Sequence, residues 1–383
     1  MFIRNADVFA DHHFHKWDLR VERGRIVEIS PWGQLTAKAG EEILEASGLL
    51  LLPGLTDIHS HGALGHDFSD ADLAGLRDIQ HFEASCGITQ YCPTSMTVPA
   101  SQLEKIFRYA GEAGRQGDPE GAAWFCGIHM EGPWLNPGKL GAQNPENVQQ
   151  ISWEEFIRFQ ELSGNLLRIV SLAPEMEGAQ DFIRKAAGHV LLSLGHSQAN
   201  YETASWAFAQ GVHHVTHLFN AMEPLRHRQP GPIAAAFENP QVSVELIADG
   251  IHVHPAMIRL AFKLFKDRLC LISDSMRATG LGDGSYELGG QQVMVKGREA
   301  RISTGALAGS VSPLDVMLRR AVSFGVPLED ALFAASEYPA RRIGIAGEAG
   351  VIAVGRRANL ILSDPELNFQ RIFLNGKAIR MAQ

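Results

Sequence analysis

The chain has 383 residues, of which 45% are hydrophobic and 20% charged, with a formal net charge of −9. This composition is typical of a globular protein and argues against a disordered or membrane-associated class. Binding to a nucleic-acid backbone needs a basic surface, so the acidic balance also argues against nucleic acid as a partner. The four cysteines lack CxxC spacing and no secretory signal is evident, which favours reduced thiols and a cytoplasmic location.

The two ends of the chain share one pattern. Residues 1–52 alternate short apolar runs with turn signals and show no helical periodicity, and residues 344–383 do the same. We therefore expect the two ends to pair into one small β-sandwich domain. Residues 53–343 would then be a second domain inserted between them.

The inserted region alternates strand-like and helix-like segments, which is the pattern of βα units and a parallel sheet. Eight such units close a barrel, so the predicted fold is an α/β protein with a TIM-like (β/α)8 barrel. The predicted strands are 49–58, 88–95, 124–130, 167–173, 190–195, 213–218, 242–248 and 269–273. The predicted helices are 70–84, 100–111, 153–162, 179–187, 201–209 and 255–265, followed by a hairpin at 286–302 and closing helices at 313–323 and 328–336.

Acidic and imidazole side chains follow the predicted strands, where each strand ends. They are His59, His61, His129, Glu131, His196, His217, His252 and Asp274. Right-handed crossovers place the carboxyl end of every strand on one face of a barrel, so we expect these side chains to converge there. A buried charge or unpaired imidazole is costly in a core strand, which favours a functional role.

Glu131, His196 and His217 come from three different strands and form a common zinc ligand set that leaves a position for water. His59 and His61 are two residues apart and can hold a cation together, although an isolated HxH pair is weak evidence. The ligands suit Zn²⁺ best and also Fe²⁺, Co²⁺ or Mn²⁺, with one or two ions per subunit. Asp274, which only a metal or a protonated partner could neutralise, is suited to general acid/base catalysis.

The spaced motifs resemble the N-acetylglucosamine-6-phosphate deacetylase family of the amidohydrolase superfamily over nearly the whole chain. The motifs are the HxH at 59–61, His129-Met130-Glu131-Gly132-Pro133-Trp134-Leu135, Gly195-His196-Ser197, Thr216-His217-Leu218-Phe219-Asn220-Ala221-Met222, Asp249-Gly250-Ile251-His252-Val253, Ser273-Asp274-Ser275-Met276 and Leu307-Ala308-Gly309-Ser310. The resemblance implies that Glu131, His196 and His217 hold the main metal and that Asp274 is the catalytic acid/base.

The resemblance also implies the substrate-binding residues and the assembly. These residues are Ala142, Gln143, Asn220, Ala221, Arg228, His252, Leu307, Ala308 and Gly309, with Arg228 on the phosphate of a phosphorylated amino sugar. Arg226, His227 and Arg228 form a compact cationic loop, which suits an anion contact. A homodimer is implied as well, and Arg228 would act either in its own subunit or in the neighbouring one.

One residue departs from the family pattern. The family usually has a His where this chain has Gln143, and an amide can donate a hydrogen bond but cannot titrate near neutral pH. The predicted reaction is deacetylation of N-acetylglucosamine 6-phosphate to glucosamine 6-phosphate and acetate, by a metal-activated water with Asp274 as general acid/base. Because of Gln143, N-acetylgalactosamine 6-phosphate or another N-acyl amine remains an alternative substrate.

Two further alternatives remain open. A non-catalytic barrel would have no need for four metal-site and acid/base residues at once, and metal analysis of the purified protein would identify it. A cyclic-amide hydrolase or deaminase on the same barrel is disfavoured, because the fourth predicted strand offers no lysine to bridge two metals.

Overall fold

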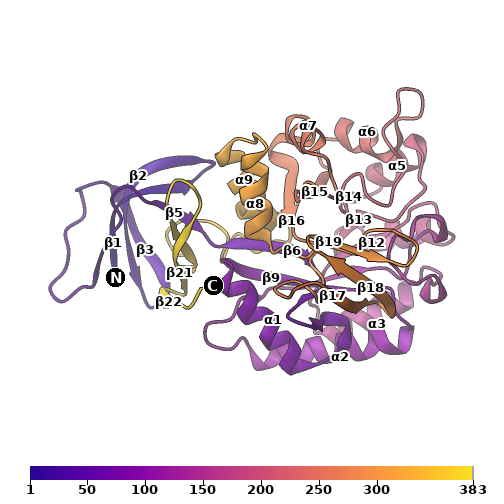
Figure 1. Cartoon of the computed structure of the whole chain (residues 1–383), viewed down its shortest axis with the longest axis horizontal. Helices are drawn as coiled ribbons and strands as arrows, with labels where there is room; N and C mark the ends of the chain where they lie inside the picture. The colour runs from indigo at the N-terminus through magenta and orange to yellow at the C-terminus, as the bar shows by residue number, and fades with distance from the viewer. Residues whose placement is uncertain (382–383) are drawn as a thin grey trace.

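The computed structural model describes residues 1–381 and shows two groups of strands (Figure 1). The first is an eight-stranded sheet built from both ends of the chain, with the order β22-β21-β20-β5-β1-β2-β3 and β4 paired to β1. Its strands are β1 (Phe2–Ala10), β2 (His13–Glu22), β3 (Arg25–Pro31), β4 (Ile43–Glu45), β5 (Leu50–Pro53), β20 (Leu360–Ser363), β21 (Phe369–Leu374) and β22 (Lys377–Ile379). The predicted pairing of the two chain ends is therefore confirmed.

This terminal sheet folds over a core of its own. Ile3, Leu19, Leu51 and Leu360 are buried in one apolar cluster, separate from the larger cluster of the barrel. The edge strand β3 turns back toward the start of β20, where the Ile26 N–H donates to the Arg356 carbonyl at 3.0 Å. Two separate cores support a division into two domains. The exact boundaries, with residues 1–52 and 344–383 in one domain and 53–343 in the other, stay a prediction.

The second group is the predicted barrel of parallel strands, which carries helices on its outside. The strand order is β10-β9-β11-β12-β13-β14-β15-β16, with β6 paired to β9. The strands are β6 (Leu55–Ser60), β9 (Ile88–Ser95), β10 (Trp124–Phe125), β11 (Ile128–Glu131), β12 (Leu167–Leu172), β13 (Leu191–Leu194), β14 (Val212–Val215), β15 (Ser243–Ile247) and β16 (Leu269–Ile272). The Asp274 N–H donates to the His59 carbonyl at 2.8 Å, so the chain just after β16 meets the last residues of β6 and closes the barrel.

The structure corrects the predicted first and third strands. The segment 49–58 is two strands, because β5 pairs with β1 in the terminal sheet and β6 pairs with β9 in the barrel. The break falls at Pro53 and Gly54, where a Cβ on Gly54 would lie 2.0 Å from the Thr89 hydroxyl oxygen. The segment 124–130 is likewise interrupted, and β10 and β11 are its two parts.

The helices bury one face against the barrel. In α2, Leu103, Ile106, Phe107 and Ala110 follow the spacing of a helix face and are buried. The helices are α1 (Leu73–Ser85), α2 (Ala100–Gln116), α3 (Trp153–Ser163), α4 (Ala179–Ala186), α5 (Tyr201–Ala209), α6 (Gly231–Glu238), α7 (Pro255–Phe265), α8 (Leu314–Ser323), α9 (Leu328–Ala335) and α10 (Glu337–Arg342). The predictions omitted α6 and α10. Among residues 1–381, no helix is both long and apolar enough to cross a membrane.

A small antiparallel sheet lies beside the barrel mouth (Figure 1). It consists of β17 (Gly284–Leu288), β18 (Gln291–Lys296) and β19 (Glu299–Ile302), where the sequence predicted only a hairpin. The Gln291 amide donates to the Ala142 carbonyl at 2.6 Å, which ties this three-stranded sheet to the loop after β11. A further two-stranded ribbon, β7 (Gly62–Ala63) and β8 (His66–Asp67), follows β6.

Candidate metal centre and active site

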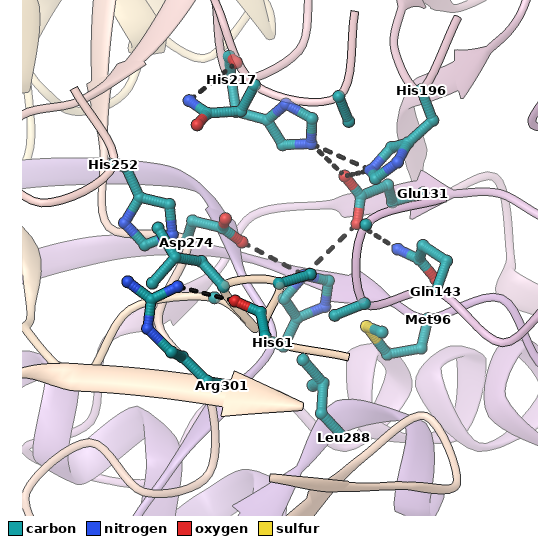
Figure 2. A pocket seen from close by; sticks show the side chains of 18 residues that line it. His61, Met96, Glu131, Gln143, His196, His217, His252, Asp274, Leu288 and Arg301 are labelled. Carbon is teal, nitrogen blue, oxygen red and sulfur yellow. Dashed lines mark hydrogen bonds and ion pairs between the residues drawn. The ribbon is translucent and has the colours of Figure 1, made fainter. Parts of the chain in front are cut away.

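A cavity of about 360 Å³ opens at the carboxyl ends of the barrel strands (Figure 2). Its volume lies within the range of small-molecule sites. The residues that line it are His61, Met96, Glu131, Gly141, Ala142, Gln143, His196, His217, Asn220, Ala221, His252, Asp274, Leu288, Arg301, Gly305, Ala306, Leu307 and Gly309. Most of the predicted site residues are among them, so the predicted convergence is confirmed.

Glu131, His196 and His217 line this cavity and point toward one another (Figure 2). The Glu131 Oε1 atom lies 3.2 Å from His196 Nε2 and 3.0 Å from His217 Nε2, and the two imidazole nitrogens are 3.0 Å apart. Ligand atoms around a tetrahedral zinc ion, with bonds of about 2.0–2.1 Å, are roughly 3.3 Å apart. The three donors therefore fit a divalent metal in both chemistry and spacing.

His59, His61 and Asp274 form a second group next to the first. Asp274 Oδ1 lies 3.4 Å from His59 Nε2 and 3.3 Å from His61 Nε2. The second carboxylate oxygen of Glu131 lies 3.4 Å from His61 Nε2, so Glu131 faces both groups. The two imidazole rings that face Asp274 are protonatable partners of the kind expected for this carboxylate in the absence of a metal. We refer to His59, His61, Glu131, His196, His217 and Asp274 as the mouth cluster.

The two carboxylates of the mouth cluster favour positive charge on the groups around them. Burial disfavours the Glu131 carboxylate, but the nearby His59 and His196 rings outweigh burial and hold the pKa of Glu131 well below its usual range. Burial likewise disfavours the His61 cation, yet Asp274 and Glu131 raise the pKa of His61 to about 10. A divalent ion would supply the same positive charge and displace these protons.

Beneath the mouth cluster lies a second buried group, the interior cluster of His129, His214 and Glu245. Glu245 Oε2 accepts hydrogen bonds from His59 Nδ1 at 2.9 Å and from the His217 main-chain N–H at 3.1 Å. His214 Nε2 lies 3.1 Å from Glu245 Oε1. The sequence predicted His129 at the barrel mouth, but it does not line the cavity, and its Nε2 instead lies 2.7 Å from the Ser171 hydroxyl inside the barrel.

The backbone that presents the mouth cluster is unusual. His196, His217 and Asp274 have φ angles of 48°, 27° and 47°, in the left-handed region that non-glycine residues rarely occupy. Such conformations cost roughly 1–3 kcal/mol and concentrate at functional sites. Gly309 packs closely against the backbone of Asp274, because a Cβ on Gly309 would lie 2.8 Å from the Asp274 carbonyl oxygen.

The structure places the other predicted site residues in different surroundings. Gln143 donates to Glu131 Oε2 at 2.7 Å and accepts from the Thr97 N–H at 2.8 Å, so its amide holds the carboxylate. His252 Nδ1 contacts Asp249 Oδ2 at 2.8 Å, which leaves its Nε2 free. Ala308 is buried and does not line the cavity.

Arg228 does not line the cavity of its own chain. Its loop is exposed, and its guanidinium contacts the His227 ring at 2.6 Å. The sequence reasoning missed several lining residues, namely Met96, Gly141, Leu288, Arg301, Gly305 and Ala306. Leu288 and Arg301 belong to the three-stranded sheet, and no spacing in the sequence indicated that this sheet would reach the cavity.

The fold and the site define a barrel hydrolase, and the chain belongs to the amidohydrolase family, whose model matches residues 50–379. It is therefore an enzyme of a metal-dependent class that cleaves amide bonds. It is 34% identical over 361 residues to the N-acetylgalactosamine-6-phosphate deacetylase of Escherichia coli O157:H7, covering 94% of this chain and 93% of that protein. It is 38% identical over 328 residues to the N-acetylglucosamine-6-phosphate deacetylase of Bacillus subtilis strain 168, covering 84% and 82%.

A solved structure is similar along the whole chain. The crystal structure of N-acetyl-D-glucosamine-6-phosphate deacetylase from Mycobacterium smegmatis has a TM-score of 0.91 and 31% identity, and covers 99% of this chain and 100% of that chain. The family resemblance inferred from the sequence is therefore confirmed, together with the barrel and its separate terminal sheet.

Proposed function

We propose that this chain is a deacetylase of an N-acetyl amino sugar 6-phosphate, with N-acetylglucosamine 6-phosphate as its preferred substrate. The observation that carries the proposal is the meeting of Glu131, His196 and His217 beside Asp274 in one cavity. The activities of the two relatives concern this substrate class. The reaction would hydrolyse the acetamido C–N bond and release acetate and glucosamine 6-phosphate.

Glu131, His196 and His217 would hold a divalent ion, with zinc as the proposed identity, and His59 and His61 would help to hold a second. Such an ion polarises a carbonyl oxygen and lowers the pKa of a water to roughly 7. The carboxylate of Asp274, which borders the cavity, would accept a proton from the attacking water. It would then return that proton to the amine nitrogen as the C–N bond breaks, because an unprotonated amine is a poor leaving group.

Asp274 is in the ionised state that the first of these steps requires. Burial raises the pKa of this carboxyl, but the His59 and His61 rings lower it below its usual value. Asp274 is therefore ionised and ready to accept a proton near neutral pH. Its main-chain N–H is bonded to the His59 carbonyl, which fixes the position of the carboxylate relative to the histidines.

The remaining roles in the cavity follow from its lining. We propose that Ala142, Gln143, Asn220, Ala221, His252 and the segment 307–309 surround the sugar. We also propose a homodimer, in which Arg228 of each chain would reach the cavity of the other, since its loop is exposed and does not line its own cavity. Light scattering of the purified protein tests the dimer, and a monomer would exclude this role for Arg228.

The test of the function is a substrate comparison with metal-loaded protein. Acetate and free amine are measured with N-acetylglucosamine 6-phosphate, N-acetylgalactosamine 6-phosphate and unphosphorylated N-acetylglucosamine. We expect the highest kcat/KM with the first. The second remains a candidate, because one relative carries that activity and Gln143 departs from the family pattern. If neither of the two sugar phosphates released acetate, the proposal would be contradicted. Metal analysis of the same sample identifies the ion.

A further inference from the structure

A second cavity opens at the opposite end of the barrel from the mouth cluster. It has a volume of about 440 Å³, within the range of small-molecule sites, and lies where β12, β13 and β14 begin. Among the lining residues that the structure describes there is no aspartate or glutamate, and the basic ones are Arg168, His189, His213 and Arg342. We refer to this cavity as the basal pocket.

The positive charge of the basal pocket is not balanced by carboxylates. The chain has 43 acidic side chains against 34 lysines and arginines, so its basic groups have carboxylates in excess to pair with. Arg341, the neighbour of Arg342 in α10, pairs with Glu337, yet none of the four basic residues of the pocket forms an ion pair within residues 1–381. Burial lowers the pKa of His213, and the nearby Arg342 guanidinium lowers it further. The pocket therefore attracts a negatively charged ligand.

The two arginines of the basal pocket are held in position but keep free donors. Arg342 Nη2 donates to the His213 carbonyl at 2.8 Å, which leaves four of the five N–H groups of this guanidinium. Its Nε atom is buried and has no hydrogen-bond partner among residues 1–381. The stem of Arg168 packs against Gly127, where a Cβ would lie 2.2 Å from Arg168 Cγ. Because a buried donor without a partner is costly, these groups favour a ligand that accepts hydrogen bonds.

Stabilisation of a helix end explains only part of this charge. Arg342 lies in the last turn of α10, where a cation offsets the partial negative charge of the helix end by roughly 0.3–1 kcal/mol. Arg168 and His213, however, belong to β12 and β14. A single helix end therefore does not account for basic side chains that come from two strands, a loop and a helix.

We propose that the basal pocket binds a small anion through its phosphate group, with Arg168 and Arg342 as the charged donors. His189 and His213 border the same pocket and contribute further contacts. The site lies apart from the cavity of the proposed deacetylation, so the inference goes beyond that function. A phosphate suits the pocket better than a carboxylate, because its three oxygens can bond to several donors at once and match the planar fork of an arginine. Inorganic phosphate and a sugar phosphate present the same group, and the experiment distinguishes them.

The experiment measures binding of inorganic phosphate, glucose 6-phosphate and acetate to the metal-loaded protein by titration calorimetry. Arg168→Ala and Arg342→Ala are compared with Arg115→Ala as a matched control, because Arg115 is an exposed arginine in the last turn of α2 that does not line the pocket. We expect one phosphate-binding event whose Kd rises about tenfold to hundredfold in the two pocket variants and not in the control. The constant with which phosphate inhibits deacetylation reports on the mouth cavity and should be the same in all four proteins.

The three ligands separate the possible occupants. If glucose 6-phosphate binds more tightly than inorganic phosphate, and both depend on Arg168 and Arg342, the occupant is a sugar phosphate. Equal or weaker binding of glucose 6-phosphate, with the same dependence, makes inorganic phosphate the occupant. If no phosphate binding depends on the two arginines, or if acetate binds as tightly as phosphate, the inference is wrong. Should Arg342→Ala fail to fold, Arg168→Ala decides together with Arg342→Lys, which keeps the charge and should retain part of the binding.

Discussion

The mouth cluster and the interior cluster both combine histidines with a buried glutamate, but they differ in charge balance. Each has a buried glutamate, Glu131 or Glu245, whose pKa is held well below its usual range by neighbouring histidines despite the opposing effect of burial. In the interior, burial lowers the pKa of His129 to about 3 and also lowers the pKa of His214. In the mouth, carboxylates overcome the effect of burial and raise the pKa of His61 to about 10.

The comparison explains which cluster is suited to a metal. The interior histidines are neutral and bond to the hydroxyls of Ser171 and Ser243, so their polar atoms are satisfied within the protein. The mouth cluster combines two carboxylates with imidazole nitrogens that face one another, and it borders a cavity. The outer layer is therefore suited to an ion and a substrate, and the inner layer is suited to positioning that outer layer.

Of three substitutions that test this comparison, Asp274→Asn in the mouth cluster should have the largest effect. An amide cannot accept the proton of the attacking water, so kcat should fall by about 10²- to 10⁴-fold. Glu131, His196 and His217 remain, so the metal content of the purified variant should not change. Steady-state kinetics and elemental analysis measure both quantities, with Asp267→Asn on the surface as the control. Unimpaired turnover would remove Asp274 from the proposed mechanism.

Glu245→Gln should give an intermediate effect, because it acts through other residues. Gln keeps the shape of the side chain but weakens its contacts with His59 Nδ1 and the His217 N–H. Such supporting partners typically contribute 10- to 100-fold to metal affinity or activity. Competition with a chelator measures the affinity, and Glu202→Gln on the surface of α5 is the matched control. A folded variant with unchanged metal affinity would show that the interior cluster does not position the mouth cluster.

Gln143→Ala should give the smallest effect of the three. It removes the hydrogen bond to Glu131 Oε2, and bonds to charged groups contribute about 1.5–3 kcal/mol. The carboxylate keeps its contacts with His61, His196 and His217, so we expect kcat/KM to fall by about tenfold. Gln143→His restores an N–H donor and should lie between Ala and the parent. If Gln143→Ala and Gln143→His both have the kcat/KM of the parent protein, the Gln143 amide has no part in orienting Glu131.

The regular elements were predictable where their patterns were strong. Seven of the eight predicted barrel strands overlap strands of the barrel alone, and α7 has the predicted bounds. Helix α6 was missed because its sequence, with Ile233, Ala235 and Ala236 buried, is apolar on most sides and lacks a clear polar face. Helix α10 was missed because Pro339 lies inside it, and proline is normally a signal that a helix ends.

The sequence by itself determined which side chains gather at one end of the barrel. Parallel strands joined by right-handed crossovers must end on the same face, so Glu131, His196, His217 and Asp274 meet whatever the details of packing. Only the tertiary structure decided how deep in the barrel each side chain lies. His129 and Glu131 are two residues apart on β11 and share its inward side, yet about 6.6 Å of strand separates them, so one joins the interior and the other reaches the cavity. The placement of Arg301 depended in the same way on where the small sheet folds back over the barrel, which no local pattern specifies.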